Sequence, residues 1–219
     1  MERGPFLARL RERLAAPLQP AVSAHPVEAY TGTAAAAYLR PLDDLAAAFA
    51  EEAAALGVVV RRVAPGGVAG FLAEVVAARG VRSAVVSRDP EAAGAATALQ
   101  ALGVRVLPFD GPASAAAADL GVTGAVCGIA ATGSIVVAAD RAGGRSASLL
   151  PPVHAALVPA RSLVATPTAV LGRLPEVFPQ GLPSQVVIIT GPSRTGDIEL
   201  VLVRGVHGPG HVWVGLLEE

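Results

Sequence analysis

The chain has 219 residues, 53% of them hydrophobic and 16% charged, and a formal net charge of −1. This length suits one α/β domain, the composition excludes a disordered or fibrous protein, and the near-neutral charge argues against a broad nucleic-acid-binding surface. The sequence contains no lysine, which excludes a Schiff-base lysine and a phosphate-loop lysine.

Metal and disulfide chemistry is restricted by the cysteine count. Cys127 is the only cysteine, so the chain has no disulfide framework, no CxxC pair and no set of thiolates for an iron–sulfur cluster of its own. The four histidines lack HxH and HExxH spacing, and we therefore predict no bound metal. If this protein acts in redox metabolism, we expect the metal to be bound by a partner protein.

The N-terminal 40 residues are expected to form an arm. A short helix is predicted over residues 5–14, followed by the breakers Pro17, Pro20 and Pro26. Charged residues interrupt the apolar ones at the start, so we predict no export signal and a cytoplasmic location. Residues 41–219 are expected to form a single α/β domain.

The first half of this domain alternates between helices and short apolar strands. The predicted elements are a helix at 42–56, a strand at 58–63, a helix at 68–79, a strand at 83–87, a helix at 90–102 and a strand at 104–109. Such alternation is typical of βαβ crossovers and predicts a sheet covered by helices on both faces.

In the second half the strands follow one another closely. Predicted strands are at 122–129, 134–139, 155–159, 186–190 and 212–217, and predicted helices are at 168–174 and 197–204. The uncharged run 120–139 approaches the length of a membrane span, but its glycines and β-branched residues indicate strands around a turn, so we expect no membrane insertion. We predict a three-layer α/β/α sandwich with a mixed, mostly parallel sheet.

The loop after the strand at 186–190 has the ingredients of an anion site. Gly191 permits close backbone approach, Ser193 and Thr195 offer hydroxyls, and Arg194 offers a planar fork for a carboxylate or phosphate. Ligands in open α/β sheets bind where strands end, which favours this loop. The alternative is a capped helix start with Arg194 paired to Glu199 at the surface.

Three nearby residues are candidate acids or bases. Asp197 and Glu199 suit proton transfer, although they equally suit the role of orienting neighbouring arginines. His207 lies between glycines in a loop, where a histidine is a candidate acid, base or hydrogen-bond donor; the alternative is a turn residue without a task.

Two upstream segments add possible ligand contacts. Thr132, Gly133 and Ser134 are predicted to form a hairpin-like turn in "GIAATGSIVV". The frequent alternative is a turn that contacts no ligand. His154 in "SLLPPVHAALVP" borders an apolar strand, where a core histidine bonded to the backbone is the frequent alternative.

In their order along the chain, "GIAATGSIVV", "SLLPPVHAALVP" and "ITGPSRTGDIELVLVRGVHGPG" resemble the lactate utilization protein C family, whose members carry a LUD domain. The resemblance covers residues 121–217. It implies a fold similar to that of sugar-phosphate isomerases and CoA transferases. It also implies oxidation of L-lactate to pyruvate together with two iron–sulfur proteins, so that the clusters belong to partners and this chain binds no cofactor.

Ten residues match recurring positions of that family: Thr132, Gly133, Ser134, His154, Ser193, Arg194, Thr195, Asp197, Glu199 and His207. The segment around Thr132 departs from the family pattern. Ala131 stands where many members have an acidic residue, and Ser134 stands in place of a threonine. A mechanism that requires that carboxylate, as in CoA transferases of similar fold, is therefore not open to this chain.

Three functions remain as hypotheses. The first is a subunit of a lactate-oxidising system that binds a small carboxylate or another anion at residues 191–210. The second is a stand-alone enzyme acting on a phosphorylated or CoA-linked small molecule. The third is a non-catalytic scaffold or regulatory subunit.

Overall fold

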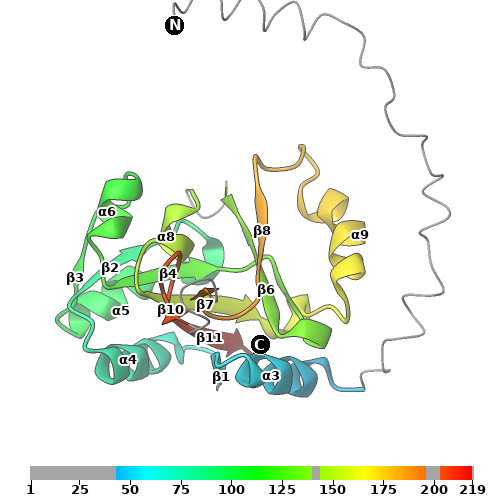
Figure 1. Cartoon of the computed structure of the whole chain (residues 1–219), viewed down its shortest axis with the longest axis horizontal. Coiled ribbons are helices and arrows are strands. Elements are labelled where there is room, and N and C mark those ends of the chain that lie inside the picture. Colours follow the sequence, from blue (N-terminus) through cyan, green and yellow to red (C-terminus); the bar gives the residue numbers. More distant parts are fainter. Residues whose placement is uncertain (1–42, 140–143, 196–202, 219) are drawn as a thin grey trace, which may run out of the picture. The chain divides into compact units, whose positions relative to one another are not determined.

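The structure is a computed structural model that describes residues 43–139, 144–195 and 203–218. The arm with its helix at 5–14 lies outside the described residues, and so do Asp197 and Glu199. The described chain is an α/β fold, as predicted, built around one parallel sheet (Figure 1).

Six parallel strands form this central sheet, in the order β1-β11-β7-β4-β2-β3. They are β1 (Val59–Val63), β2 (Ser83–Val86), β3 (Arg105–Val106), β4 (Leu120–Gly124), β7 (Val153–Pro159) and β11 (His211–Leu217). We call the side of the sheet where these strands begin its amino edge and the side where they end its carboxyl edge. β4, β7 and β11 are almost wholly buried, which explains their largely apolar sequence.

Two helices cover one face of the sheet. They are α4 (Val68–Arg79) and α5 (Ala95–Ala101), and they bury Leu72 and Leu99 against strand residues such as Leu157. All three side chains are fully buried, and each stabilises the fold by about 2 kcal/mol relative to an exposed position. This cluster is the largest of the clusters that make up the described core.

The opposite face is covered by helices and by a second sheet. Helix α3 (Leu45–Ala55) begins at the N-cap Asp44 and packs Phe49 against Val214 of the sheet and Ile135 of the second sheet. Short helices α6 (Pro112–Ala116) and α8 (Ser146–Leu149) lie over β2 and β4. The central sheet is therefore the middle of three layers.

The second sheet is antiparallel, with the order β5-β6-β8. Its strands are β5 (Cys127–Ile129), β6 (Ser134–Ala138) and β8 (Val186–Ile189), and α9 (Pro167–Val177) packs on its outer side through Val170 (Figure 1). The hairpin predicted around Thr132 is confirmed as the β5–β6 connection. The parallel and antiparallel pairings that we expected in one mixed sheet occur in two separate sheets.

Several predicted boundaries were wrong. The helix at 90–102 is interrupted at Gly94, whose φ of 82° separates the 3-10 turn η2 (Pro90–Ala92) from α5. The strand at 104–109 pairs only at β3, and the run 122–129 divides into β4 and β5, which join different sheets. The short helices α6 and α8 were not predicted. The helix at 197–204 is wrong at its end, because Val203–Arg204 is strand β10.

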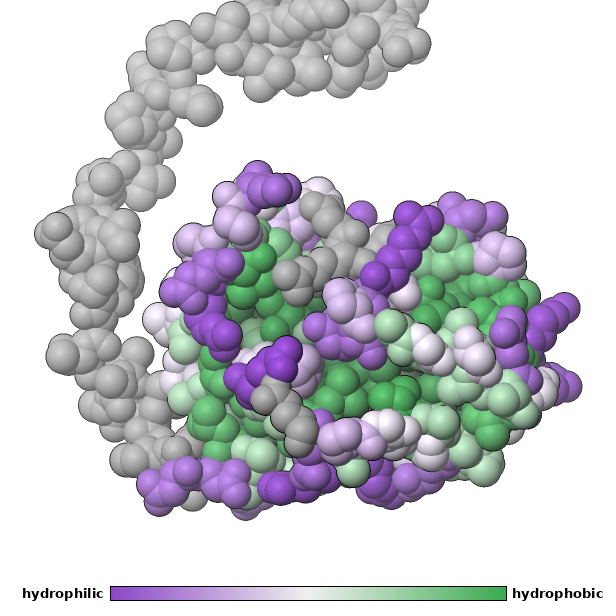
Figure 2. All heavy atoms as spheres, turned by 180° about the vertical axis from the view of Figure 1, so that it is seen from behind, coloured by the Kyte–Doolittle hydropathy of each residue, from purple (hydrophilic) through white to green (hydrophobic). Residues whose placement is uncertain are grey.

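Apolar residues also reach the surface. Within the described ranges, the exposed large apolar residues include Leu149, Leu150 and Val206, each more than 40% exposed. Figure 2 shows a face on which apolar residues gather in patches, with hydrophilic residues between and around them. Among the described helices, none combines the length and the apolar character needed to cross a bilayer.

Candidate functional site

The loops at 191–195 and 203–210 form one hydrogen-bonded unit. β9 (Arg194–Thr195) pairs with β10 in antiparallel register. The backbone N–H of Ser193 donates to the carbonyl of Pro209 at 2.9 Å, and the N–H of Gly205 donates to the carbonyl of Ser193 at 3.0 Å. Ser193, Arg194, Thr195 and the 205–210 turn are therefore held together, and we call this unit the loop ribbon.

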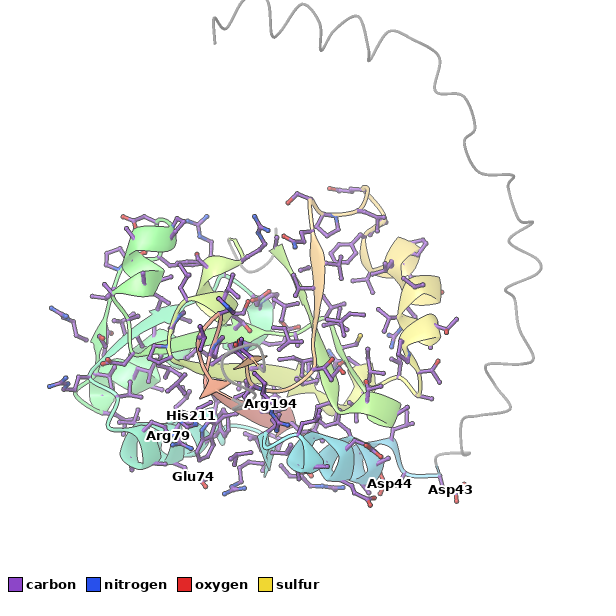
Figure 3. The ribbon with its side chains drawn as sticks, in the orientation of Figure 1. Asp43, Asp44, Glu74, Arg79, Arg194 and His211 are labelled. Atoms are coloured by element: carbon purple, nitrogen blue, oxygen red, sulfur yellow. The ribbon has the colours of Figure 1, made fainter. Side chains whose placement is uncertain are left out.

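Arg194 is anchored to the end of helix α3. Its guanidinium donates to the carbonyl of Leu56, which is the C-cap residue of that helix. In Figure 3 Arg194 lies at the end of α3 opposite to Asp43 and Asp44. A cation is favourable there because the last carbonyls of a helix lack intrahelical partners and carry partial negative charge. Arg194 remains exposed, and this bond uses one of its several donors.

Gly191 and Gly133 are required where the chain meets α3. Gly191 has a φ of 79°, and a Cβ there would lie 3.0 Å from Cβ of Leu56. Gly133 has a φ of 58°, and a Cβ there would lie 2.2 Å from the backbone nitrogen of Ala53. Only glycine fits both the backbone conformation and the space at Gly133. The glycine in the TGS motif is therefore explained by packing on α3.

Three hydroxyls connect the β5–β6 hairpin with the end of β8. The Oγ atoms of Thr132 and Ser134 are 2.7 Å apart, and Ser134 Oγ lies 2.9 Å from Thr190 Oγ1. Ser134 is 1% exposed, whereas Thr190 is exposed. Because Thr190 directly precedes Gly191, this chain of hydroxyls joins the predicted TGS turn to the loop ribbon.

His154 is buried in the central sheet, beside β4. Its Nε2 is 2.9 Å from Oγ1 of Thr123, and both side chains are completely buried. Nδ1 of His154 has no hydrogen-bond partner in the described part of the chain. Burial lowers the pKa of His154 to about 4, so its imidazole is neutral at physiological pH. None of its described hydrogen bonds connects it to the loop ribbon.

His207 lies in the exposed turn of the loop ribbon. A Cβ on the neighbouring Gly208 would lie 3.3 Å from Cβ of Ser193 and 3.6 Å from Cδ1 of Leu149. The turn thus runs close to Ser193 and to the exposed end of α8. A small residue is needed at Gly208 for this close approach.

The loop ribbon lies at the amino edge of the central sheet, which differs from our expectation. β8, which precedes it, belongs to the antiparallel sheet, and the 205–210 turn leads into the start of β11. There the N–H of His211 donates to the carbonyl of Pro152, and Nε2 of His211 lies 3.4 Å from Nη1 of Arg79 (Figure 3). The sequence argument from the carboxyl ends of parallel strands was wrong for this loop because β8 is not in the parallel sheet.

Among the described residues, no group of three or more His, Cys, Asp and Glu side chains is arranged to hold a metal ion. Cys127 is 4% exposed, and burial raises the pKa of its thiol to about 11. A thiol in this state is a poor metal ligand, since thiolates bind metals. The described residues therefore offer no set of thiolates for an iron–sulfur cluster.

The carboxyl edge holds a polar group that the sequence analysis missed. Oδ2 of Asp89 accepts hydrogen bonds from the hydroxyl of Ser87 at 2.5 Å and from the N–H of Gly124 at 3.0 Å. Asp89 is only 5% exposed. A cleft of about 310 Å³ opens at this edge, lined by Pro90, Glu91, Pro159, Arg161, Leu217 and Glu218. The position of Asp89 in the loop shortly after the apolar strand β2 was the available signal.

Comparison with known proteins identifies the family. The LUD domain family model matches residues 46–217. Lactate utilization protein C of Shouchella clausii is 40% identical over 93 residues, which cover 42% of this chain and 41% of that protein. The protein of the same name from Anoxybacillus flavithermus is 35% identical over 144 residues, covering 63% of this chain and 64% of that protein.

The chain spans only about two fifths of the length of several of these relatives. For the Shouchella clausii protein the aligned share is 41%. A crystal structure of a DUF162 family protein from Deinococcus radiodurans has a TM-score of 0.62 and 23% sequence identity, covering 81% of this chain and 100% of that one. This likeness supports the fold, and the relatives confirm the resemblance drawn from the sequence motifs. The chain belongs to the LUD domain family.

Proposed function

We propose that this chain is a component of a system that oxidises L-lactate to pyruvate, and that its loop ribbon binds the small carboxylate. The name of the relatives, lactate utilization protein C, supports the metabolic role. The observation that carries the site is the pair of hydrogen bonds joining Ser193 to Pro209 and Gly205. They hold the hydroxyl of Ser193, the guanidinium of Arg194 and the imidazole of His207 on one unit.

In this proposal the guanidinium of Arg194 binds the carboxylate through the N–H donors that its hydrogen bond to Leu56 does not use. Ser193 and Thr195 supply hydroxyl contacts, and His207 is the candidate acid or base, with Asp197 and Glu199 as further candidates. The Thr132–Ser134–Thr190 hydroxyls and Gly133 support the strand end from which the loop ribbon departs. His154, a candidate ligand contact in the sequence analysis, is a neutral imidazole buried in the central sheet and has no part in this proposal.

We assign the electron acceptors to partner proteins. Conversion of L-lactate to pyruvate releases two electrons and two protons. An iron–sulfur cluster needs several thiolates, and this chain has a single, buried cysteine. Exposed apolar residues, Val206 on the loop ribbon and Leu149 and Leu150 at the end of α8, offer the kind of surface that partner proteins cover.

Growth on L-lactate tests the site. Arg194→Ala in cells that depend on this protein should abolish growth on L-lactate and leave growth on pyruvate unchanged. Arg105→Ala, which alters an exposed arginine on the edge strand β3, is the matched control and should support normal growth. Normal growth of the Arg194 variant at wild-type protein levels would refute the assignment of the carboxylate site.

Affinity purification from lactate-grown cells tests the partnership. Two iron–sulfur proteins should co-purify with the wild-type chain. If the purified chain instead converts phosphorylated or CoA-linked compounds by itself, the alternative of a stand-alone enzyme replaces this proposal.

A further inference from the structure

The cleft at the carboxyl edge lies where three parallel strands end. Pro159 is the last residue of β7 and Leu217 is the last residue of β11, while Pro90 and Glu91 belong to the η2 turn that follows β2. Arg161 belongs to the turn η4 (Ala160–Ser162), which follows β7. Open α/β sheets bind ligands at this edge because the loops leaving the strands form a crevice there.

The direction of the connections also reverses beside this cleft. From β2 the chain moves outward to the edge strand β3, and it then returns to β4 on the other side of β2 before continuing to β7 and β11. Such a topological switch point separates the loops of neighbouring strands and is the preferred position for a ligand. The structure places Asp89 at this point, because its carboxylate bridges the loop after β2 and the end of β4.

The backbone of Gly124 is closely packed against two acidic side chains at this point. A Cβ on Gly124 would lie 2.5 Å from Cβ of Asp89 and 2.6 Å from Oε2 of Glu91. The end of β4 therefore has to be glycine for both acidic residues to approach it. Asp89 is fixed by its bonds to Ser87 and Gly124, whereas the half-buried carboxylate of Glu91 makes no hydrogen bond or ion pair within the described residues. Glu91 therefore lines the cleft with a carboxylate that is available to a ligand.

Charges of both signs line the cleft. Glu218 is paired with Arg62 at 3.6 Å, and the other charged side chains that line the cleft are Glu91 and Arg161. Arg161 is exposed, and an arginine has several N–H donors, so it can donate hydrogen bonds to a carboxylate in addition to its other contacts. The buried Asp89 adds negative charge near Glu91, which favours a cationic group on that side.

We propose that the carboxyl-edge cleft binds a small zwitterion of the amino-acid type. Its ammonium group pairs with Glu91, its carboxylate pairs with Arg161, and its short apolar side chain packs against Pro90, Pro159 and Leu217. The volume of about 310 Å³ is at the small end of ligand pockets, which suits a molecule of this size. The cleft is at the opposite edge of the sheet from the loop ribbon, so this proposal is independent of the proposed function.

Calorimetric titration of the full chain with L-alanine tests the proposal. L-lactate is the matched probe because it differs from L-alanine only in a hydroxyl in place of the ammonium group. L-alanine should bind more tightly than L-lactate. Glu91→Gln should raise the Kd for L-alanine about tenfold, as loss of one charge-assisted contact implies. Arg161→Gln should weaken both ligands by a similar factor.

Glu176→Gln and Arg105→Gln are the controls, because both alter exposed residues outside the cleft and should leave the Kd unchanged. Circular dichroism checks that each variant is folded, and the two cleft variants test the site separately. Three outcomes would overturn the proposal: no heat from L-alanine, an unchanged Kd in both cleft variants, or L-lactate binding as tightly as L-alanine.

Discussion

The imidazole of His154 and the hydroxyl of Thr123 are hydrogen-bonded to one another across neighbouring strands, with both side chains fully buried. The pair leaves Nδ1 of His154 without a partner among the described residues. A buried polar atom of this kind costs about 1–3 kcal/mol unless it gains a partner. The pair is therefore a polar element retained inside an apolar layer at a cost in stability.

The depressed pKa of His154 predicts acid sensitivity. Its folded pKa of about 4 is below the unfolded value of 6.5, so the unfolded chain binds more protons between these values. Stability should therefore fall as the pH drops through this range, by up to about 1.4 kcal/mol per pH unit from this residue.

Urea denaturation near neutral pH and near pH 5 measures this effect, using the variant His154→Gln. The variant should be less stable overall, but it should lose less stability on acidification than the wild type. His207→Gln is the control, because His207 is exposed and its removal should leave the acid sensitivity intact. Equal acid sensitivity in wild type and His154→Gln would contradict the assignment.

Gly133→Ala should destabilise the fold through a clash with α3. The new Cβ would lie 2.2 Å from the nitrogen of Ala53, at a φ that disfavours alanine. We expect a loss of about 2–4 kcal/mol in the free energy of unfolding, from overpacking and backbone strain together. Gly80→Ala is a matched control with a φ of 61° and open space, so it should lose only about 1 kcal/mol. Similar losses in the two variants would mean that α3 moves freely away from Gly133.

Ser134→Ala should weaken the connection between the hairpin and β8. It removes the middle hydroxyl of the Thr132–Ser134–Thr190 chain from a site that is 1% exposed. We expect thermal unfolding to show a loss of about 1–2 kcal/mol. Ser134→Thr keeps the hydroxyl and should restore most of this stability. Failure of threonine to do so would indicate that side-chain volume, rather than hydrogen bonding, matters at Ser134.

Cys127 should resist alkylation in the folded protein. Its thiol is 4% exposed and its pKa is raised to about 11, so little thiolate forms at mildly alkaline pH. Mass spectrometry after iodoacetamide treatment should show an unmodified native chain and a single addition after denaturation in urea. Rapid modification without urea would show that the second sheet opens away from α9.

The parts of the fold that were predicted correctly are those determined by local sequence. Helix α4 was predicted to the residue, because glycines flank it at Gly67 and Gly80 and the latter adopts a left-handed conformation at its end. The core strands β7 and β11 were also found within two residues of their predicted bounds, whereas the predicted strand at 122–129 divides into β4 and β5. The interruption at Gly94 was missed because one glycine in an alanine-rich run is equally compatible with a continuous helix.

Strand partners were not predictable in the same way. The apolar run that contains β8 reads the same whether it joins a parallel or an antiparallel sheet, and it joins the antiparallel one. The candidate site was therefore assigned to the wrong edge of the central sheet. The order of the motifs nevertheless indicated correctly that the residues around Ser193 and those around Pro209 come together.

The position of β11 between β1 and β7 has a consequence for how the protein is made. Among the described strands, β1 has β11 as its only neighbour, and their pairing joins opposite ends of the domain sequence. During synthesis, β1 therefore has no strand to pair with among the described strands until β11 has emerged from the ribosome. Closure of such distant contacts is slow, and unpaired strand edges favour aggregation, so this pairing is a late and aggregation-sensitive step of folding.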